Sequence, residues 1–188
     1  MNSKEKLLQI AFDEIYENGY ASTSVDKILK KANMNKGSMY HFFKSKKELT
    51  LGMIEAHISK YIEDRYGAIL EKEDNYIAAI LDSIRTNREK SSIYGCRLNN
   101  LVQELSHKDE DFKKELEKIY LRFEQIIEEA LKRALENKEI SHPDLKTLSI
   151  FVVASLEGCL ATAKKSQDEK VFATCINELE NYFNQLKI

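Results

Sequence analysis

Residues 19–49 contain two short helix patterns separated by a break, and this arrangement restricts the fold more than any other feature of the chain. In the first pattern, four apolar residues share one helix face: Val25, Ile28, Leu29 and Ala32. Thr23 precedes them and Asp26 follows three residues later, so a capping box is expected to open this helix. Asn33 and Met34 are expected to end it.

A second short helix is expected directly after this break. Asn35 is a favourable N-cap, and the helix would run from Lys36 to about Phe43 with Met39 directed inward. Three lysines, at positions 44, 46 and 47, follow or lie just beyond it. Two short helices that are joined by a tight turn and followed by basic residues are typical of a helix-turn-helix that reads the major groove of DNA.

Helical patterns also account for the rest of the chain, which has one proline and six glycines. Residues 3–18 form an amphipathic pattern that ends at Asn18-Gly19, and this helix is expected to brace the other two. A long helix is expected over residues 46–71. Further helices are expected over residues 75–90, 97–106, 109–137, 143–165 and 168–186. The sequence therefore predicts an all-α fold of about nine helices.

The segment between residues 19 and 49 resembles the DNA-binding signature of the TetR/AcrR family of bacterial transcriptional regulators. The matching residues are Gly19, Tyr20, Thr23, Ser24, Val25, Ile28, Ala32, Met34, Lys36, Gly37, Ser38, Met39, Tyr40, Phe43 and Lys46 to Leu49. The resemblance implies an all-helical homodimer whose variable C-terminal domain senses a small molecule. It further implies a helix-turn-helix DNA-binding domain at residues 1–47 and an effector-binding and dimerisation domain at residues 48–188.

The charges are unevenly distributed along the chain, although the net charge is only −2. Residues 1–50 hold nine lysines and six acidic residues, a surplus of three positive charges. Residues 51–188 hold 20 basic and 25 acidic residues, a surplus of five negative charges. The basic surplus coincides with the helix-turn-helix, as expected for a surface that contacts the phosphates of double-stranded operator DNA. Lysines that are merely solvated are the alternative.

The resemblance implies two roles for the polar residues around the second short helix. The residues expected to contact bases or phosphates in the major groove are Lys36, Ser38, Tyr40 and His41. The residues expected to contact phosphates are Thr23 or Ser24, Lys44 and Lys46. A partly buried Tyr40 and a merely exposed His41 are the alternatives. Residues 1–50 contain no arginine, so bidentate recognition of guanine by arginine is not expected from them.

The last two expected helices are the predicted dimer interface, because both carry apolar rows. The row on residues 143–165 consists of Leu148, Phe151, Val152, Ser155, Leu156 and Cys159. The row on residues 168–186 consists of Val171, Phe172, Cys175, Ile176, Leu179 and Phe183. Both rows also fit an internal core. A dimer is favoured by the family and by the geometry of a palindromic operator, whose two reading helices must lie about 34–36 Å apart.

Gly95-Cys96 and residues 156–164 are similar to the subgroup of this family that includes the repressor of N-ethylmaleimide reductase, in which a cysteine at the matching place senses electrophiles. The resemblance implies that Cys96 and Lys164 belong to an effector or sensor site. A thiol at a helix N-terminus beside a cation, such as Arg97 or Lys164, forms more of the reactive thiolate. The alternative is that Cys96 is a small packing residue. The small-molecule effector itself is unknown.

No catalytic or metal-binding pattern is visible in the sequence. The four histidines are dispersed, and neither a phosphate-binding glycine loop nor a nucleophile elbow occurs. We therefore expect neither an enzyme nor a cofactor, and we interpret Glu104, Asp109 and Glu110 as solvated helix ends. A helical protein that binds a partner protein or a small molecule without binding DNA is the alternative class.

The remaining patterns indicate a cytoplasmic protein. No uninterrupted run of about 18 apolar residues occurs, and the N-terminal residues carry charges of both signs, so neither a membrane span nor a signal peptide is indicated. The three cysteines Cys96, Cys159 and Cys175 are odd in number and lack the spacing of metal ligands. They are expected to be reduced thiols.

Overall fold

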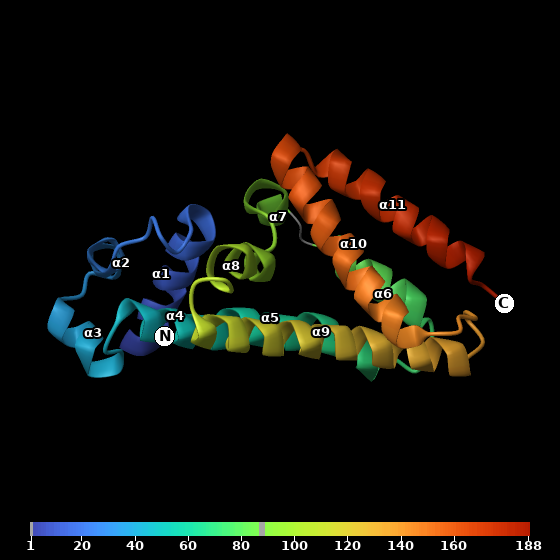
Figure 1. Ribbon diagram of the computed structural model, residues 1–188, viewed down its shortest axis with the longest axis horizontal. Coiled ribbons are helices and arrows are strands. Elements are labelled where there is room, and N and C mark those ends of the chain that lie inside the picture. Colours follow the sequence, from blue (N-terminus) through green and yellow to red (C-terminus); the bar gives the residue numbers. More distant parts are fainter. Residues whose placement is uncertain (1, 87–88) are drawn as a thin grey trace. The chain divides into compact units, whose positions relative to one another are not determined.

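The computed structural model describes residues 2–86 and 89–188, and these residues are helical apart from their connecting loops and one isolated bridge between Ile140 and Lys187 (Figure 1). The α-helices are α1 (Ser3–Asn18), α2 (Val25–Ala32), α3 (Lys36–Phe42), α4 (Lys46–Met53), α5 (Lys60–Tyr66), α6 (Tyr76–Arg85), α7 (Glu89–Tyr94), α8 (Arg97–Leu105), α9 (Glu110–Glu136), α10 (Leu145–Ser166) and α11 (Glu169–Gln185). The predicted all-α fold is confirmed.

Two predicted helices differ in detail from those observed. The helix expected over residues 46–71 is formed by α4, a π-helical segment η1 (Ile54–Ser59), α5 and a 3-10 segment η2 (Gly67–Glu71) in direct succession. The helix expected over residues 75–90 is divided into α6 and α7. Residues 87 and 88, which fall between them, lie outside the described residues.

The chain divides into two compact units, and they do not follow the predicted division between residues 47 and 48. Unit 1 comprises the residues up to Tyr61 together with Arg97–Glu117, and unit 2 comprises Ile62–Cys96 together with Lys118–Ile188. The physical reason lies inside unit 1. The helix that begins at Lys46 packs on α1, and side chains from 97–117 bond to the residues around α1 and α4.

In unit 1, α1 provides the surface on which the helix-turn-helix is built. Its inner face buries seven residues: Leu7, Leu8, Ala11, Phe12, Glu14, Ile15 and Tyr16. These side chains pack against α2 and α4. Gly19, with φ +83°, ends the helix in a backbone conformation that favours glycine, as the Asn18-Gly19 pair predicts. Met39 of α3 and Leu49 of α4 are completely buried, which anchors both helices.

In unit 2, α10 and α11 form a hairpin that packs side by side (Figure 1). Most of the two predicted apolar rows lies inside this unit: Leu148, Val152, Leu156, Cys159, Phe172, Ile176, Leu179 and Phe183 are buried. The internal-core alternative therefore holds for these eight side chains. Of the other four residues in these rows, Ser155, Val171 and Cys175 have intermediate exposure. Phe151 is 47% exposed, and its neighbour Ile150 is 45% exposed.

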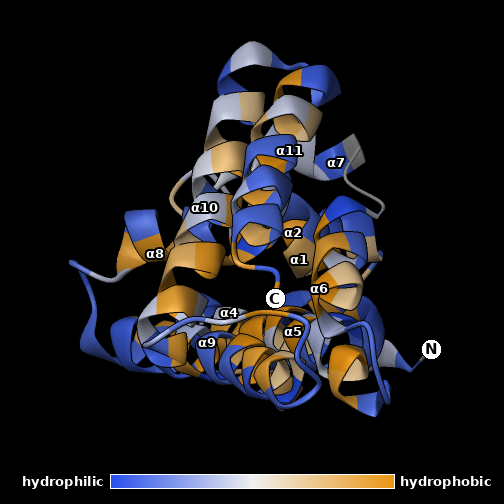
Figure 2. Cartoon of the chain, turned by 90° about the vertical axis from the view of Figure 1, so that its right-hand side faces the viewer, coloured by the Kyte–Doolittle hydropathy of each residue, from blue (hydrophilic) through white to orange (hydrophobic). Residues whose placement is uncertain are grey.

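The composition of α10 is unusually apolar for a helix at the surface. Among the described residues, it is the one helix that is long and apolar enough to cross a membrane, a test that buried helices of soluble proteins also pass. Only 44% of its most apolar 18-residue stretch is buried in the structure. White and orange predominate along α10 in Figure 2, whereas α11 shows more blue. The uncovered part of α10 is therefore a surface suited to an apolar partner.

Candidate DNA interface and effector region

The local sequence fixes the start of α3. The Asn35 side chain accepts a hydrogen bond from the backbone N–H of Ser38 at 2.8 Å, which confirms Asn35 as the N-cap. A Cβ atom at Gly37 would lie 3.2 Å from the capping oxygen of Asn35, so glycine leaves room for the cap. Met39 is completely buried beneath α3 and holds this short helix against the rest of the helix-turn-helix.

The outer face of α3 presents three of the predicted groove residues to solvent. Tyr40 is 55% exposed, and Lys36 and His41 are also exposed, whereas Ser38 is half-buried. Lys36 pairs with Asp26 of α2 at 3.0 Å, but both side chains are well exposed, so this ion pair is weak and open to exchange for a phosphate. The partly buried alternative for Tyr40 does not describe this structure.

The two residues at the start of α2 have different roles from those expected. Ser24, rather than Thr23, is the N-cap, and its hydroxyl accepts from the backbone N–H of Lys27 at 3.1 Å. Thr23 is 1% exposed, and its hydroxyl donates to the carbonyls of Glu14 and Gly19. The predicted capping box from Thr23 to Asp26 is therefore wrong. The cap falls at Ser24 because Thr23 is needed to close the loop after α1.

Glu14 holds two lysines of the helix-turn-helix in place. This buried carboxylate of α1 pairs with Lys27 at 2.7 Å and also with Lys31, both on α2. Burial disfavours its charged form, but the hydrogen bonds from Lys27 and Lys31 outweigh that cost, so the pKa of Glu14 lies below its ordinary value. Lys27 and Lys31 therefore form ion pairs within unit 1 and are less available to DNA phosphates than unpaired lysines would be.

The lysines after α3 also differ in their availability. Lys44 is exposed, and its backbone N–H donates to Glu48. The ammonium group of Lys46 donates to the carbonyl of Tyr20 and lies 4.0 Å from the centroid of the Tyr20 ring. Burial lowers the pKa of Lys46, although the charge of Glu104 opposes the shift. Lys46 thereby ties the start of α4 to the turn between α1 and α2.

Lys47 is held by two carboxylates at the start of α9. Its ammonium group lies 2.8 Å from Asp109 and 2.6 Å from Asp111. The hydrogen bond to Asp109, followed by that to Asp111, raises the pKa of Lys47. Lys47 therefore joins α4 to α9 within unit 1, and the structure corrects the interpretation of Asp109 as a solvated helix end.

Glu104 of α8 bonds directly to the turn that follows α1. Its two carboxylate oxygens accept from the backbone N–H groups of Tyr20 at 2.8 Å and Ala21 at 2.7 Å. The interpretation of Glu104 as a solvated helix end is therefore wrong. Sequence spacing gave no signal of this contact, because more than 80 residues separate its two sides. The carboxylate fixes the entry to α2, on which the position of α3 depends.

We expect Glu104→Ala to destabilise unit 1 by about 1–3 kcal/mol, because two backbone N–H groups lose a charged acceptor and the hydrogen bond from Tyr20 is partly buried. Urea denaturation followed by circular dichroism measures the change. Glu117→Ala, an exposed carboxylate of α9 in the same unit, is the matched control and should have almost no effect. Glu104→Gln retains one acceptor oxygen and should lie between the two. Equal stabilities of Glu104→Ala and Glu117→Ala would contradict the role given to Glu104.

The predicted sensor residues lie on unit 2. Gly95, with φ +83°, ends α7, and Cys96 follows it with intermediate exposure, directly before α8. Lys164 is exposed in the last turn of α10. Burial raises the pKa of Tyr120 on α9, and negative charges of Glu157, Cys96 and Glu124 add to the shift. Cys96, Glu157 and Glu124 thus all lie near enough to the Tyr120 phenol to affect its pKa.

A cleft of about 350 Å³ lies between α6 and α11 of unit 2. Apolar lining is provided by Ile77, Leu81 and Phe183, and charged side chains at the cleft include Arg85 and Glu180, which pair at 2.7 Å. This size and mixture suit a small molecule with an apolar body and a polar group. Among the described residues, no group of histidine, cysteine and acidic side chains is arranged to hold a metal ion.

The structure contradicts the expectation of three reduced thiols. Cys159 of α10 and Cys175 of α11 form a disulfide, whereas Cys96 is not disulfide-bonded. An odd number of cysteines and a reducing compartment favour free thiols, but neither indicates which cysteines lie side by side in the fold. The hairpin of α10 and α11 brings the Cα atoms of Cys159 and Cys175 to 5.6 Å, a distance that spacing along the chain does not reveal.

Comparisons with known proteins identify the family of this chain. Residues 3–53 match the family described as bacterial regulatory proteins, tetR family, and residues 75–178 match the C-terminal domain described as transcriptional regulator LmrA/YxaF-like. A regulator encoded in the lacX 3′ region of Lactococcus lactis is 33% identical over 99% of this chain and 92% of its own length. The chain therefore belongs to the TetR family and is a DNA-binding transcriptional regulator, as the resemblance implies.

Two further similarities concern the repressor NemR of Escherichia coli. The two sequences are 26% identical over a region that covers 72% of this chain and 70% of NemR. The crystal structure of its reduced form has a TM-score of 0.85 at 23% identity and covers 96% of this chain and 97% of that chain, which shows the shared fold. Regulators of this type are soluble cytoplasmic proteins that act on operator DNA as dimers, and they are generally not enzymes. The alternative of a helical protein without DNA binding finds no support.

Proposed function

We propose that the protein is a homodimeric repressor that binds a palindromic operator through α3 and is released by a small molecule or a thiol-reactive electrophile. The observation that supports this most directly is the outer face of α3, where Lys36, Tyr40 and His41 are exposed on a helix anchored by Met39. An exposed polar face on a buried apolar base is what a reading helix requires.

We assign the proposed DNA contacts from the position and exposure of each side chain. Lys36, Ser38, Tyr40 and His41 face the major groove, where Tyr40 contributes most to the choice of sequence because its exposed ring can contact base edges. Ser24 and Lys44 contact phosphates from either side of the groove. Thr23, being buried, supports the loop beneath Ser24. The ammonium group of Lys46 contacts phosphate only through the N–H groups that do not bond to the Tyr20 carbonyl.

We expect Lys44→Ala to weaken binding to all DNA sequences about equally and to reduce the salt slope of binding by about one, because one phosphate contact is lost. Fluorescence anisotropy with operator and random duplexes at several salt concentrations measures both quantities. Lys72→Ala removes an exposed lysine of unit 2 and is the matched control, for which no change is expected. A loss confined to the operator would contradict a phosphate role for Lys44.

The proposed dimer interface is the uncovered face of α10 together with the neighbouring face of α11. Phe151, Ala154, Gly158 and Ala161 recur at spacings of three and four and are all exposed, so they share this face. A Cβ atom at Gly158 would meet nothing within 4 Å in its own subunit, which leaves room for a partner helix to approach. A second copy of the same face supplies a matching apolar surface across a two-fold axis.

The proposed effector acts on unit 2. In the covalent version, an electrophile alkylates Cys96, and Lys164 belongs to the same sensor site, as in the subgroup that the sequence resembles. In the non-covalent version, a ligand occupies the cleft between α6 and α11. Either event releases DNA only if it favours a dimer conformation in which the reading helices no longer fit the operator.

N-ethylmaleimide distinguishes these two versions. In a background that carries Cys159→Ser and Cys175→Ser, we expect it to release the protein that retains Cys96 from the operator and to leave Cys96→Ser bound, because the serine hydroxyl does not react under the same conditions. Cys96→Ala serves as a second variant without a hydrogen-bonding group. Release of both variants by N-ethylmaleimide would exclude Cys96 as the sensor. Failure of the reagent to release any form would favour the non-covalent version.

A further inference from the structure

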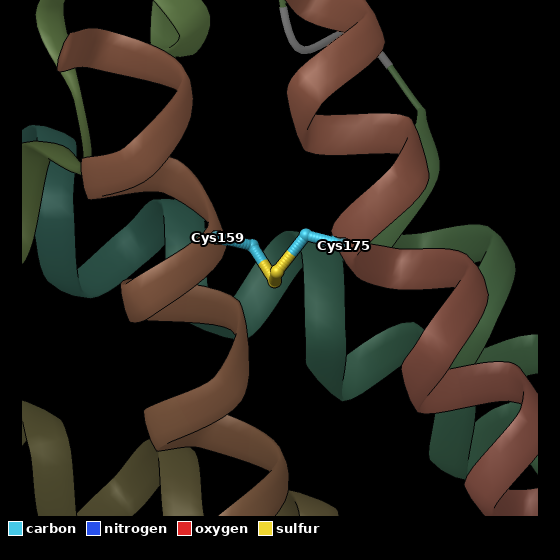
Figure 3. Close-up of a disulfide and its surroundings, with 2 residues drawn as sticks. All are labelled: Cys159 and Cys175. Atoms are coloured by element: carbon cyan, nitrogen blue, oxygen red, sulfur yellow. A yellow bond between two sulfur atoms is a disulfide. The ribbon is translucent and has the colours of Figure 1, made fainter. Parts of the chain in front are cut away.

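The disulfide between Cys159 and Cys175 joins the two helices of the α10–α11 hairpin (Figure 3). The two cysteines are 16 positions apart along the chain, and the turn between them contains Gln167 in a left-handed conformation with φ 52°. The packing of the hairpin thus holds the two side chains opposite each other. The contacts between α10 and α11 thus contribute to this proximity together with the bond itself.

A permanent disulfide is unexpected in a protein that must reach DNA in the cytoplasm. Glutathione and thioredoxin keep cytoplasmic thiols reduced, and the disulfides found there are usually transient and catalytic or redox-sensing. Two cysteines that face each other at bonding distance are therefore better explained as a pair that changes its state than as a permanent cross-link.

The pair lies between the core of unit 2 and the proposed dimer face. A groove of about 270 Å³ runs between α10 and α11, and both cysteines line it, together with Phe151, Ser155, Gly158, Glu178, Leu179 and Tyr182. Cys159 is buried, whereas Cys175 has intermediate exposure. The rings of Phe151 and Tyr182 bridge the same two helices, with centroids 5.3 Å apart. A change at the cysteines therefore acts on the side chains that would meet a partner subunit.

We propose that Cys159 and Cys175 form a reversible dithiol–disulfide switch that sets the spacing of α10 and α11 and thereby the operator affinity of the dimer. The proposal rests on the proposed dimer interface. Two unbonded thiols cannot approach as closely as two bonded sulfur atoms, so reduction moves the side chains or the helices apart. Small helix shifts at subunit interfaces are a common means of switching.

The reaction is a thiol–disulfide exchange with a low-molecular-weight disulfide. The thiolate of Cys175, the more exposed residue, attacks one sulfur of that disulfide and releases one thiolate, which leaves a mixed disulfide on Cys175. The thiolate of Cys159 then attacks the Cys175 sulfur and releases the second small thiolate. In total, two protein thiols lose two electrons and two protons, and the small disulfide is reduced to two thiols.

Dimerisation and oxidation are linked in this account. A partner subunit on the groove would cover Cys175, so the exchange proceeds from the open subunit. In the cytoplasm, the dithiol is the resting form and is expected to be the form that binds the operator. Oxidation holds α11 close to α10 and shifts the equilibrium away from the binding dimer.

The test uses full-length protein with Cys96→Ser, so that only the pair can react, equilibrated with glutathione and glutathione disulfide at defined ratios. Mass spectrometry after alkylation counts free thiols, sedimentation measures the dimer, and anisotropy measures operator affinity. We expect the two free thiols to disappear together and the operator affinity to fall at least about tenfold. The control carries Cys159→Ser and Cys175→Ser in the same background and should not respond. Cys175→Ser alone replaces it if the double variant does not fold.

Two results would overturn the switch: two thiols that stay free at every glutathione ratio, or equal operator affinity of the oxidised and reduced forms. Phe151→Glu in the same background separates this failure from failure of the proposed interface. If Phe151→Glu dissociates the dimer while oxidation changes nothing, the switch is wrong and the interface stands. If Phe151→Glu leaves the dimer intact, the interface is wrong, and the switch, which depends on it, is overturned with it.

Discussion

Replacing Phe151 by glutamate is expected to raise the dissociation constant of the dimer by roughly 100-fold or more and to abolish operator binding at working protein concentrations. The reason is that Phe151 is an exposed aromatic residue on α10, and a carboxylate at the centre of an apolar interface is left without water or a partner. Analytical ultracentrifugation measures the dimer, and anisotropy measures the loss of operator binding. The isolated subunit should remain folded, because Phe151 contributes little to its core.

Two further substitutions make this result specific. Leu121→Glu introduces the same charge at a residue of α9 that is 51% exposed, and it should leave the dimer intact. Phe183 lies in the predicted apolar row of α11 but is only 1% exposed. Phe183→Glu should therefore lower the free energy of unfolding of unit 2 by about 3–5 kcal/mol and unfold it. If Phe151→Glu and Leu121→Glu gave equally stable dimers, the interface would lie elsewhere on the protein.

Replacing Tyr40 by alanine is expected to reduce operator affinity by roughly 10- to 100-fold and to change binding to random DNA much less, since a specific contact to bases is worth about 1–3 kcal/mol. We expect this specific contact from Tyr40 because it is the most exposed large aromatic residue of the helix-turn-helix. Anisotropy with both duplexes at the same salt concentration measures the two affinities.

Tyr40→Phe separates the contribution of the Tyr40 hydroxyl group to operator affinity from that of the ring. If the hydroxyl group makes the contact, the phenylalanine variant should lose nearly as much affinity as alanine, and if the ring makes it, the phenylalanine variant should bind almost normally. Neither substitution should reduce stability, because Tyr40 lies outside the core. Equal losses on operator and random DNA would show that Tyr40 acts on the backbone of DNA and not on its sequence.

The sequence was sufficient to predict the elements that depend on local signals. The caps and apolar faces of α1 and α3 are encoded within one or two helical turns, so Asn35 and Gly19 could be identified from their neighbours. At the start of α2, Thr23 and Ser24 are both good N-caps by sequence, and only the hydrogen bonds of the buried Thr23 side chain show that Ser24 is the cap.

The features that the sequence did not reveal depend on contacts between distant residues. Glu104 bonds to Tyr20 and Ala21 across more than 80 residues, and an exposed-looking acid at a helix end carries no sign of such a partner. The Cys159–Cys175 pair depends on how α10 and α11 pack. Likewise, the apolar rows could be assigned to core or interface only when the burial of Phe151 and Phe183 could be compared.

The central claim is that this chain reads a palindromic DNA sequence as a dimer, and selection of bound duplexes from a random pool tests it most directly. The protein should be kept reduced during selection. The account predicts a consensus of two inverted half-sites whose centres lie about one helical turn apart, or a small multiple of it, and which is lost when Phe151→Glu is used instead. A single, non-repeated half-site, or no consensus at all, would contradict it.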